Sequence, residues 1–275
     1  MILNGAEAMS LIIIKIGGSV ITEKDKAPLF NRLLMEKIAE ELSNVEDKLL
    51  LVHGAGSFGH PIAKKYSIHE GYRSEEQLRG VAELKQSMSS LTLMITETLI
   101  KHGIPVVPFL SSSCMVAEGS RLVNVDTEPF RLMVNLGFVP ICSGDVIADL
   151  KWGFSIVSGD QIAVYLATTL NAKTIIFGCD VDGVFDSDPK KNPEAKLIRT
   201  ITPSTLKYYE KSLGGSVAVD VTKGMLGKIK ESLSFVSHGG EVVIANLKRP
   251  ENIMEILHGR DVPCTRFIPD ITPNI

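Results

Sequence analysis

The sequence predicts an α/β protein built on an open, mainly parallel sheet with helices on both faces. Short runs of apolar, β-branched residues alternate with longer segments of helical periodicity, which is the pattern of parallel strands joined by crossover helices. Several of the short runs end in glycine, serine or aspartate. In open parallel sheets ligands bind at the carboxyl ends of the strands, so the same pattern predicts where the functional site lies.

Length and composition suit one large or two small globular domains with a substantial core. The chain has 275 residues, of which 44% are hydrophobic, and a net charge of −3, so neither nucleic acid nor an anionic membrane is an expected partner. The four cysteines form no C-x-x-C pair and are expected to be free thiols in a reducing compartment. The apolar stretch 11–21 is too short to span a bilayer, and we expect a soluble cytoplasmic protein.

The individual elements follow from local pattern. The first strand, LIIIKI, is rich in β-branched residues. Counting this strand, six apolar runs bounded by turn residues are expected to be strands: residues 11–16, 49–52, 104–110, 139–142, 174–177 and 241–245. Six segments with apolar residues at three- and four-residue spacing are expected to be helices: residues 31–43, 75–102, 130–136, 161–170, 225–238 and 251–257.

A glycine-rich turn at residues 53–60, HGAGSFGH, follows the second predicted strand. Glycines let the backbone approach a ligand, and successive N–H groups before a helix form a cradle for an anion. Other predicted strands end in KIGGS, CSGD and FGCDVDG, and a further SGD opens the helix at 161–170. Together these ends predict one crevice that holds a polyphosphate or two ligands.

Three other nucleotide or metal motifs fit the sequence less well than this cradle. Residues 54–59 fit G-x-G-x-x-G, but no strand ending in an acidic residue follows about twenty residues later, as a Rossmann dinucleotide site requires. A Walker A loop fails because His60 and Pro61 stand where Lys and Ser/Thr are needed. The acidic residues after the strand at 174–177 lack the order of a calcium loop.

Four features are candidates for chemistry, each with a plainer alternative. Lys15 lies inside an apolar strand, either as an edge lysine that reaches solvent or as a cation that contacts a phosphate. From its loop sequence alone, Lys24 is expected to be a solvated charge. His60 is either a helix-end histidine or a donor to the anion in the cradle. The stripe of Val81, Leu84 and Met88 is either helix core or the wall of a ligand pocket.

The motifs in order, KIGGS, HGAGSFGH, SGD, VSGD, CDVDGV and DVTKGMLGKI, resemble the amino-acid-kinase superfamily. Within it they resemble the isopentenyl phosphate kinase family most, because a histidine closes the GAGSFGH turn. The fosfomycin kinases share this histidine and are the alternative. More remote alternatives are a dinucleotide-binding oxidoreductase and a nucleotide sensor without catalysis.

The resemblance implies a three-layer αβα sandwich and a homodimer. It implies an N-terminal lobe, residues 1–170, for the phosphate acceptor and dimerisation, and a C-terminal lobe, residues 171–275, for ATP. The implied reaction transfers a phosphoryl group from ATP, with Mg²⁺, to isopentenyl phosphate, a small prenyl monophosphate. It belongs to an alternative mevalonate pathway of isoprenoid biosynthesis.

The resemblance also implies residue roles. The implied catalytic residues are Lys15, Lys24, His60 and Asp160, with Asp160 orienting the two lysines. The implied ATP-binding residues are Lys15, Gly17, Gly18, Ser19, Gly56, Asp180, Val181, Asp182, Gly183, Val184, Phe185, Gly224 and Lys228. The implied acceptor-binding residues are Gly54, Ala55, His60, Gly159 and, for the prenyl tail, Val81, Leu84 and Met88. No side chain is expected to form a metal site of its own.

Overall fold

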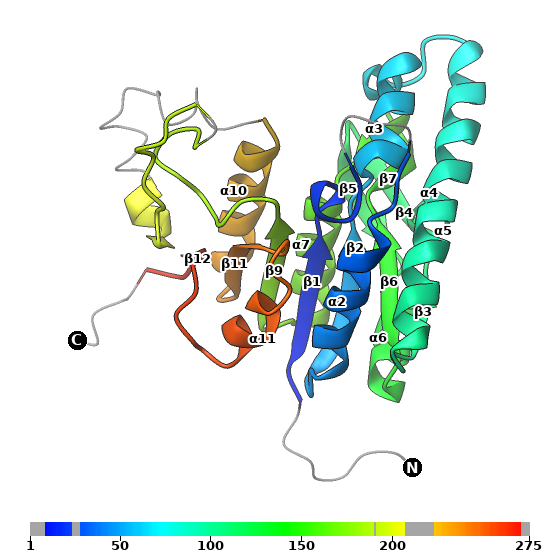
Figure 1. Cartoon of the computed structure of the whole chain (residues 1–275). Coiled ribbons are helices and arrows are strands. Elements are labelled where there is room, and N and C mark those ends of the chain that lie inside the picture. The colour runs from blue at the N-terminus through cyan, green and yellow to red at the C-terminus, as the bar shows by residue number, and fades with distance from the viewer. Residues whose placement is uncertain (1–8, 24–27, 190, 207–222, 271–275) are drawn as a thin grey trace.

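The computed structural model describes residues 9–23, 28–189, 191–206 and 223–270. Its main sheet has eight strands in the order β10-β12-β11-β9-β1-β2-β6-β3 (Figure 1). The bounds of these strands are β1 Leu11–Ile16, β2 Lys48–His53, β3 Val106–Pro108, β6 Val139–Ser143, β9 Thr174–Cys179, β10 Thr200–Ile201, β11 Glu241–Asn246 and β12 Cys264–Phe267.

The centre of the sheet is parallel, as the sequence predicts. Strand β1 lies between β2 and β9 and is parallel to both, so that Lys15 is in register with Val52 on one side and Phe177 on the other. Strand β12 is antiparallel to β11. Every residue of β1 is buried, which explains its almost continuous apolar sequence, since a central parallel strand is covered on both faces.

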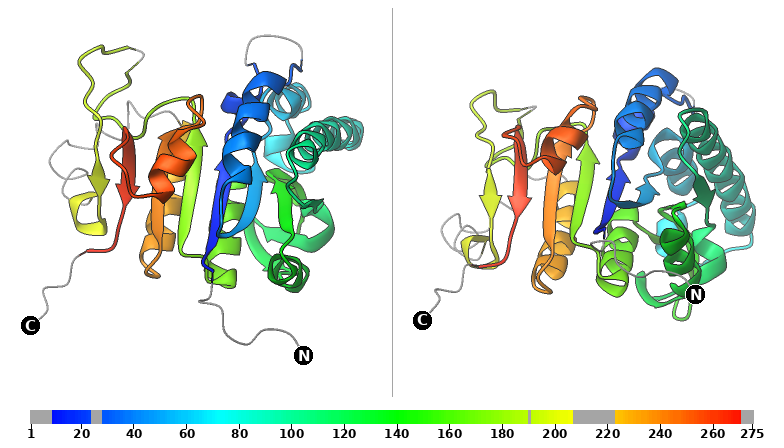
Figure 2. Two further views of the ribbon diagram at one scale, coloured as in Figure 1. Left: turned by 60° about the horizontal axis from the view of Figure 1, so that its bottom comes forward. Right: turned by 90° about the horizontal axis from the view of Figure 1, so that it is seen from below.

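Helices cover the two faces of this sheet, which gives the three layers visible in Figure 2. Alternate residues of β1 face opposite ways: Ile12, Ile14 and Ile16 belong to one apolar core, and Leu11 and Ile13 belong to the other. The first core is covered by α2 (Arg32–Ser43), α3 (Gly56–Lys65), α4 (Glu76–Lys101) and α11 (Asn252–Leu257). The second is covered by α6 (Glu128–Leu136), α7 (Gly159–Leu170) and α10 (Lys223–Val236). The short elements are α1 (Gly18–Ile21), η1 (Ile68–Glu70) and α5 (Ser111–Cys114).

A second, four-stranded sheet is the main feature that the sequence did not reveal. Its order is β5-β4-β7-β8, with β4 parallel to β7 and the other pairs antiparallel. The strands are β4 Met115–Glu118, β5 Arg121–Val125, β7 Asp145–Asp149 and β8 Gly153–Val157. All six predicted strands and all six predicted helices are present, although the strand expected at 104–110 is confined to β3.

The carboxyl ends of the central strands are joined to one another by their glycine turns. The Gly17 N–H donates to the Gly178 carbonyl at 2.9 Å, the Gly54 N–H donates to the Ile16 carbonyl at 2.9 Å, and the Gly144 N–H donates to the His53 carbonyl at 3.1 Å. These turns pack so closely that a Cβ at Gly18 would lie 2.2 Å from the backbone nitrogen of Gly56. The predicted convergence of the glycine turns at one edge of the sheet is therefore confirmed.

In the described part of the chain, no helix is both long enough and apolar enough to cross a membrane. All four cysteines are free, and three of them are buried.

Candidate active site

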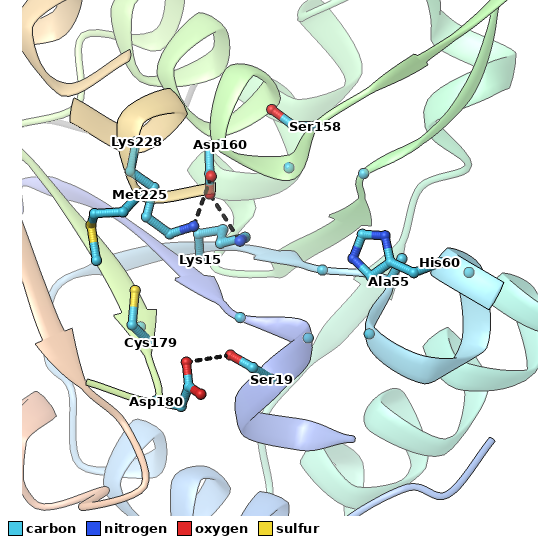
Figure 3. Close-up of a pocket in the computed structure, with 18 of the residues that line it drawn as sticks. Lys15, Ser19, Ala55, His60, Ser158, Asp160, Cys179, Asp180, Met225 and Lys228 are labelled. Carbon is cyan, nitrogen blue, oxygen red and sulfur yellow. Dashed lines mark hydrogen bonds and ion pairs between the residues drawn. The ribbon is translucent and has the colours of Figure 1, made fainter. Parts of the chain in front are cut away.

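A cavity of about 710 Å³ lies at the edge where the glycine turns meet. Its walls come from the turns after β1, β2 and β9, from helices α3, α4, α7 and α10, and from strands β7 and β8. One part of the wall carries charged groups and another part is apolar. Figure 3 shows the charged part, with His60 set apart from it.

The charged part is organised around Asp160 in the first turn of α7. One carboxylate oxygen lies 2.9 Å from Lys15 Nζ, and the other accepts a hydrogen bond from Lys228 Nζ at 2.9 Å (Figure 3). Lys15 reaches Asp160 because its position on β1 faces the side of the sheet that α7 covers. Ser158 caps α7 by accepting from the Gln161 N–H at 3.1 Å, which fixes where Asp160 stands.

All three side chains are buried, with exposed fractions of 8% for Lys15, 11% for Asp160 and 14% for Lys228. Burial by itself would raise the pKa of Asp160, but the two ammonium groups outweigh it and hold the pKa below its usual value. Burial would likewise lower the pKa of Lys228, but the Asp160 carboxylate outweighs it and raises that pKa. The cluster therefore places two lysine side chains around one carboxylate, which suits a negatively charged ligand.

The turn after β1 is also tied to the end of β9. Ser19 Oγ donates to Asp180 Oδ1 at 2.9 Å, and both residues line the cavity (Figure 3). This bond joins segments 161 residues apart in the chain. It positions a hydroxyl and a carboxylate beside the lysine cluster.

His60 lies on α3 across the cavity from the lysine cluster (Figure 3). The helix begins at Gly56, which has a positive φ of 50°. A Cβ added at this position would lie 1.9 Å from Thr22 Oγ1, so only glycine fits there. Gly54, Ala55 and Gly159 line the same region. A histidine and two helix N-termini therefore line one cavity, an arrangement that suits an anion.

The cavity also has an apolar part. Leu84 and Met88 of α4 line it together with Val146 of β7 and Ile156 of β8. Both α4 residues are nearly fully buried, with exposed fractions of 4% and 3%. Val81 packs against the same core but does not line the cavity, so the predicted stripe is divided between pocket and core.

Most of the predicted ATP-binding residues line the cavity, but Asp182 and Val184 do not. The Asp182 carboxylate is paired with Arg249 and accepts from the Asn246 side chain at 3.0 Å. Val184 is 1% exposed, and its N–H donates to Thr265 Oγ1 at 2.8 Å. Both positions hold the turn after β9 in place, while Asp180, Val181, Gly183 and Phe185 face the cavity.

Lys24 and Gly224 are two further residues with predicted roles in the site. Lys24, the expected second partner of Asp160, lies outside the described residues, and the cation that Asp160 holds besides Lys15 is Lys228. Gly224 lies in α10, one turn before Lys228. The expectation that the Gly17 and Gly54 N–H groups bind phosphate also needs revision, because both already donate to carbonyls.

Several cavity residues were not identified from the sequence. Val146 and Ile156 lie on strands of the second sheet, whose short and partly polar sequences gave no clear strand signal. Met225 of α10 also lines the cavity, three residues before Lys228. Its helical spacing to Lys228 was the signal that could have identified it.

Within the described ranges, no group of three or more His, Cys, Asp or Glu side chains is arranged to hold a metal ion. Asp180 is one of the carboxylates that line the cavity, and Mg²⁺ in phosphoryl-transfer sites is bound by one or two carboxylates together with the phosphates of the substrate.

Comparison with known proteins places the chain among kinases. The model of the amino acid kinase family matches residues 10–246. The isopentenyl phosphate kinase of Methanothermobacter thermautotrophicus is 39% identical over 94% of this chain and 98% of the relative. That of Methanocaldococcus jannaschii is 38% identical over 80% of this chain and 85% of the relative.

Solved structures agree with the sequence comparison. A crystal structure of isopentenyl phosphate kinase has a TM-score of 0.81 and 36% identity, and the match covers 94% of this chain and 99% of that one. A carbamate kinase from Giardia lamblia, at 17% identity and a TM-score of 0.73, shares the fold. The chain therefore belongs to the amino acid kinase family, in which it is similar to the isopentenyl phosphate kinases.

Proposed function

We propose that the protein transfers the γ-phosphoryl group of ATP to isopentenyl phosphate, giving ADP and isopentenyl diphosphate. The observation that carries this proposal is the composition of one cavity. It combines a buried lysine pair around Asp160, a histidine on the helix that follows an anion cradle, and an apolar wall that includes Leu84 and Met88. These features suit a prenyl monophosphate, which has a phosphate group that both binds and reacts and an apolar tail.

The chemistry requires electrostatic positioning more than a base. An alkyl phosphate has a second pKa of about 6 and is largely a dianion at neutral pH, so the attacking oxygen is already deprotonated. The difficulty is to bring two polyanions together and to stabilise the charge of the group in transfer. Lys15 contacts that group in this mechanism, and Asp160 holds Lys15 and Lys228 in place through its two oxygens.

ATP occupies the part of the cavity near β9 and α10. Ser19, Asp180, Gly183 and Phe185 line this part, and Lys228 projects into it from α10. Lys24 would complete the set of cations around the transferring group. Mg²⁺ bound to the ATP phosphates beside Asp180 would neutralise part of their charge.

The acceptor occupies the part between α3, α4 and α7. His60 donates a hydrogen bond to its phosphate, and the N-terminus of α7 at Gly159 contacts the same anion. The tail lies against Leu84 and Met88 and against the second sheet at Val146. Burial of this tail favours a prenyl phosphate over a small polar acceptor, because each buried CH₂ contributes about 0.8 kcal/mol.

The two substrates bind to consecutive parts of the chain. Residues 1–170 form the acceptor lobe and residues 171–275 form the ATP lobe, with β1 paired directly to β9 across the division. We propose that the protein acts as a homodimer in the cytoplasm.

Phosphoryl transfer from γ-³²P-labelled ATP tests the proposal. Purified protein with Mg²⁺ should label isopentenyl phosphate and leave fosfomycin, carbamate and UMP unlabelled. Labelling of fosfomycin in place of isopentenyl phosphate would identify a fosfomycin kinase. Binding of ATP with no transfer to any acceptor would identify a nucleotide sensor.

A further inference from the structure

We propose that Lys85 of α4 is a positioning residue for the acceptor. It compensates the negative charge of Asp145, so that an anionic acceptor can bind next to this carboxylate in the cavity. The inference rests on the proposed function, because it concerns how the site receives a phosphate. Neither residue belongs to the lysine cluster around Asp160.

The two residues form a closely bonded pair between α4 and β7. Lys85 Nζ lies 2.6 Å from Asp145 Oδ2 and donates to the Val146 carbonyl at 2.5 Å. The other carboxylate oxygen accepts the Val146 N–H at 2.8 Å. The Asp145 side chain is 5% exposed and that of Lys85 is 30% exposed, so Lys85 is the cation through which this buried carboxylate is neutralised.

Asp145 stands where an acceptor phosphate would approach. It lines the cavity together with Gly144 and Gly159. The turn that carries it is packed on the start of α7, since a Cβ at Gly144 would lie 2.6 Å from the Gly159 nitrogen. The N-terminus of α7 attracts an anion, whereas a bare carboxylate on the adjoining turn would repel it.

Loss of Lys85 would leave that carboxylate buried and uncompensated. Lys15 and Lys228 are already engaged by Asp160. A like charge beside a bound dianion weakens binding of the dianion without affecting groups on the far side of the cavity. We therefore expect the acceptor, and not ATP, to be affected.

The same pair also fastens α4 to β7, and the neighbouring residue Leu84 lines the cavity. A purely mechanical role would likewise disturb the acceptor when Lys85 is lost. The two roles differ in one respect: neutralising Asp145 as well would cure a charge defect but would not restore a lost cross-link.

The experiment compares Lys85→Met, Asp145→Asn and the double variant in steady-state kinetics with isopentenyl phosphate and Mg-ATP. Lys85→Met should raise the acceptor KM about tenfold and change the ATP KM less than about twofold. The double variant should return the acceptor KM to within about threefold of the wild type. A double variant as impaired as Lys85→Met, or a Lys85→Met enzyme with normal acceptor KM, would overturn the inference.

A matched control removes a lysine from a more exposed ion pair, which joins α4 to α3 instead of to β7. Lys65 lies 3.7 Å from Glu83, and its side chain is 64% exposed, so Lys65→Met should leave both KM values unchanged. If Lys85→Met does not fold, Asp145→Asn decides alone. It should leave the acceptor KM unchanged or lower it, and a severalfold increase would contradict the inference.

Failure of the proposed function is recognised separately. If the wild type transfers nothing to isopentenyl phosphate, affinity for inorganic phosphate measured by calorimetry becomes the readout. Lys85→Met should weaken it about tenfold and the double variant should recover it. Equal phosphate affinity in all variants would contradict the role of Lys85 without reference to the substrate.

Discussion

The charged and apolar parts of the cavity are built in opposite ways. The charged part joins Lys15 of β1, Asp160 of α7 and Lys228 of α10, and 68 residues separate the last two. The apolar part of α4 is local, because Leu84 and Met88 are one helical turn apart. Charges are positioned by the sheet edge as a whole, whereas the apolar wall combines one turn of α4 with Val146 and Ile156 of the second sheet. Damage to the first should therefore abolish catalysis, and damage to the second should alter acceptor choice.

The largest expected effect is at the charged part. Lys15→Ala should lower kcat by about 10²- to 10³-fold, the scale of losing one electrostatic donor to a transition state. Lys101→Ala, which removes an exposed lysine of α4, is the matched control and should have normal turnover. Steady-state assays at saturating ATP and acceptor measure both. A Lys15→Ala enzyme with nearly normal kcat would remove this residue from the mechanism.

A second prediction concerns His53, the fully buried last residue of β2. Its ring lies 2.8 Å from Thr92 Oγ1 of α4 and 3.1 Å from the Gly54 carbonyl. Burial lowers its pKa from 6.5 to about 4, and the nearby Lys15 charge adds to this effect. The folded protein therefore keeps this ring neutral over a pH range in which the unfolded chain binds a proton.

Because the unfolded chain binds this proton more readily, the protein should lose stability as the pH falls. The contribution of His53 to the free energy of unfolding is fully present above pH 6.5. It falls by up to about 3 kcal/mol as the pH drops from 6.5 to 4. Urea denaturation at several pH values measures this slope. His53→Asn should make the slope shallower, and an unchanged slope would show that His53 is not its source.

The next effect separates the acceptor phosphate from ATP. His60→Ala should lower kcat/KM for the acceptor about 10- to 100-fold, the cost of one hydrogen bond to a charged group, with the ATP KM nearly unchanged. His60→Gln keeps a neutral donor and should retain most activity. Equal loss in both variants would indicate that a positive charge at this position is required.

The smallest effect is a change of preference at the apolar part. Met88→Ala opens space in the wall and should raise the kcat/KM ratio of ten-carbon over five-carbon prenyl phosphates. About fourfold is expected for each further buried CH₂, from about 0.8 kcal/mol each. Leu91→Ala creates a core cavity in the same helix away from the site and should lower stability without changing the ratio. A shift of the ratio in Leu91→Ala would assign both effects to loosening of α4.

The same contrast explains what the sequence could predict. The parallel strands, the glycine turns at their ends and the helical periodicity of α4 are local patterns, and each was confirmed where the structure describes it. The pairing of Lys228 with Asp160 was not predicted from the residues, because it depends on two helices that meet only in the folded chain. The Lys85–Asp145 pair escaped notice for the same reason, since 60 residues separate its members.

The second sheet was missed for a different physical reason. Its strands have four or five residues, and β5 exposes most of its side chains, so apolar alternation is weak. Part of its stability comes instead from Asp149, whose carboxylate accepts backbone N–H groups from Gly119, Ser120, Lys151 and Trp152. Such bonds between loops leave no periodic signal in the sequence.

The most direct test of the central claim is ³¹P NMR of the purified protein with Mg-ATP and isopentenyl phosphate. The account predicts that the monophosphate signal declines while two coupled diphosphate signals and ADP appear, and that this change is absent with UMP, carbamate or fosfomycin. An unchanged isopentenyl phosphate signal while ATP is consumed with another acceptor would contradict the proposed substrate. An unchanged spectrum with every acceptor would contradict phosphoryl transfer itself.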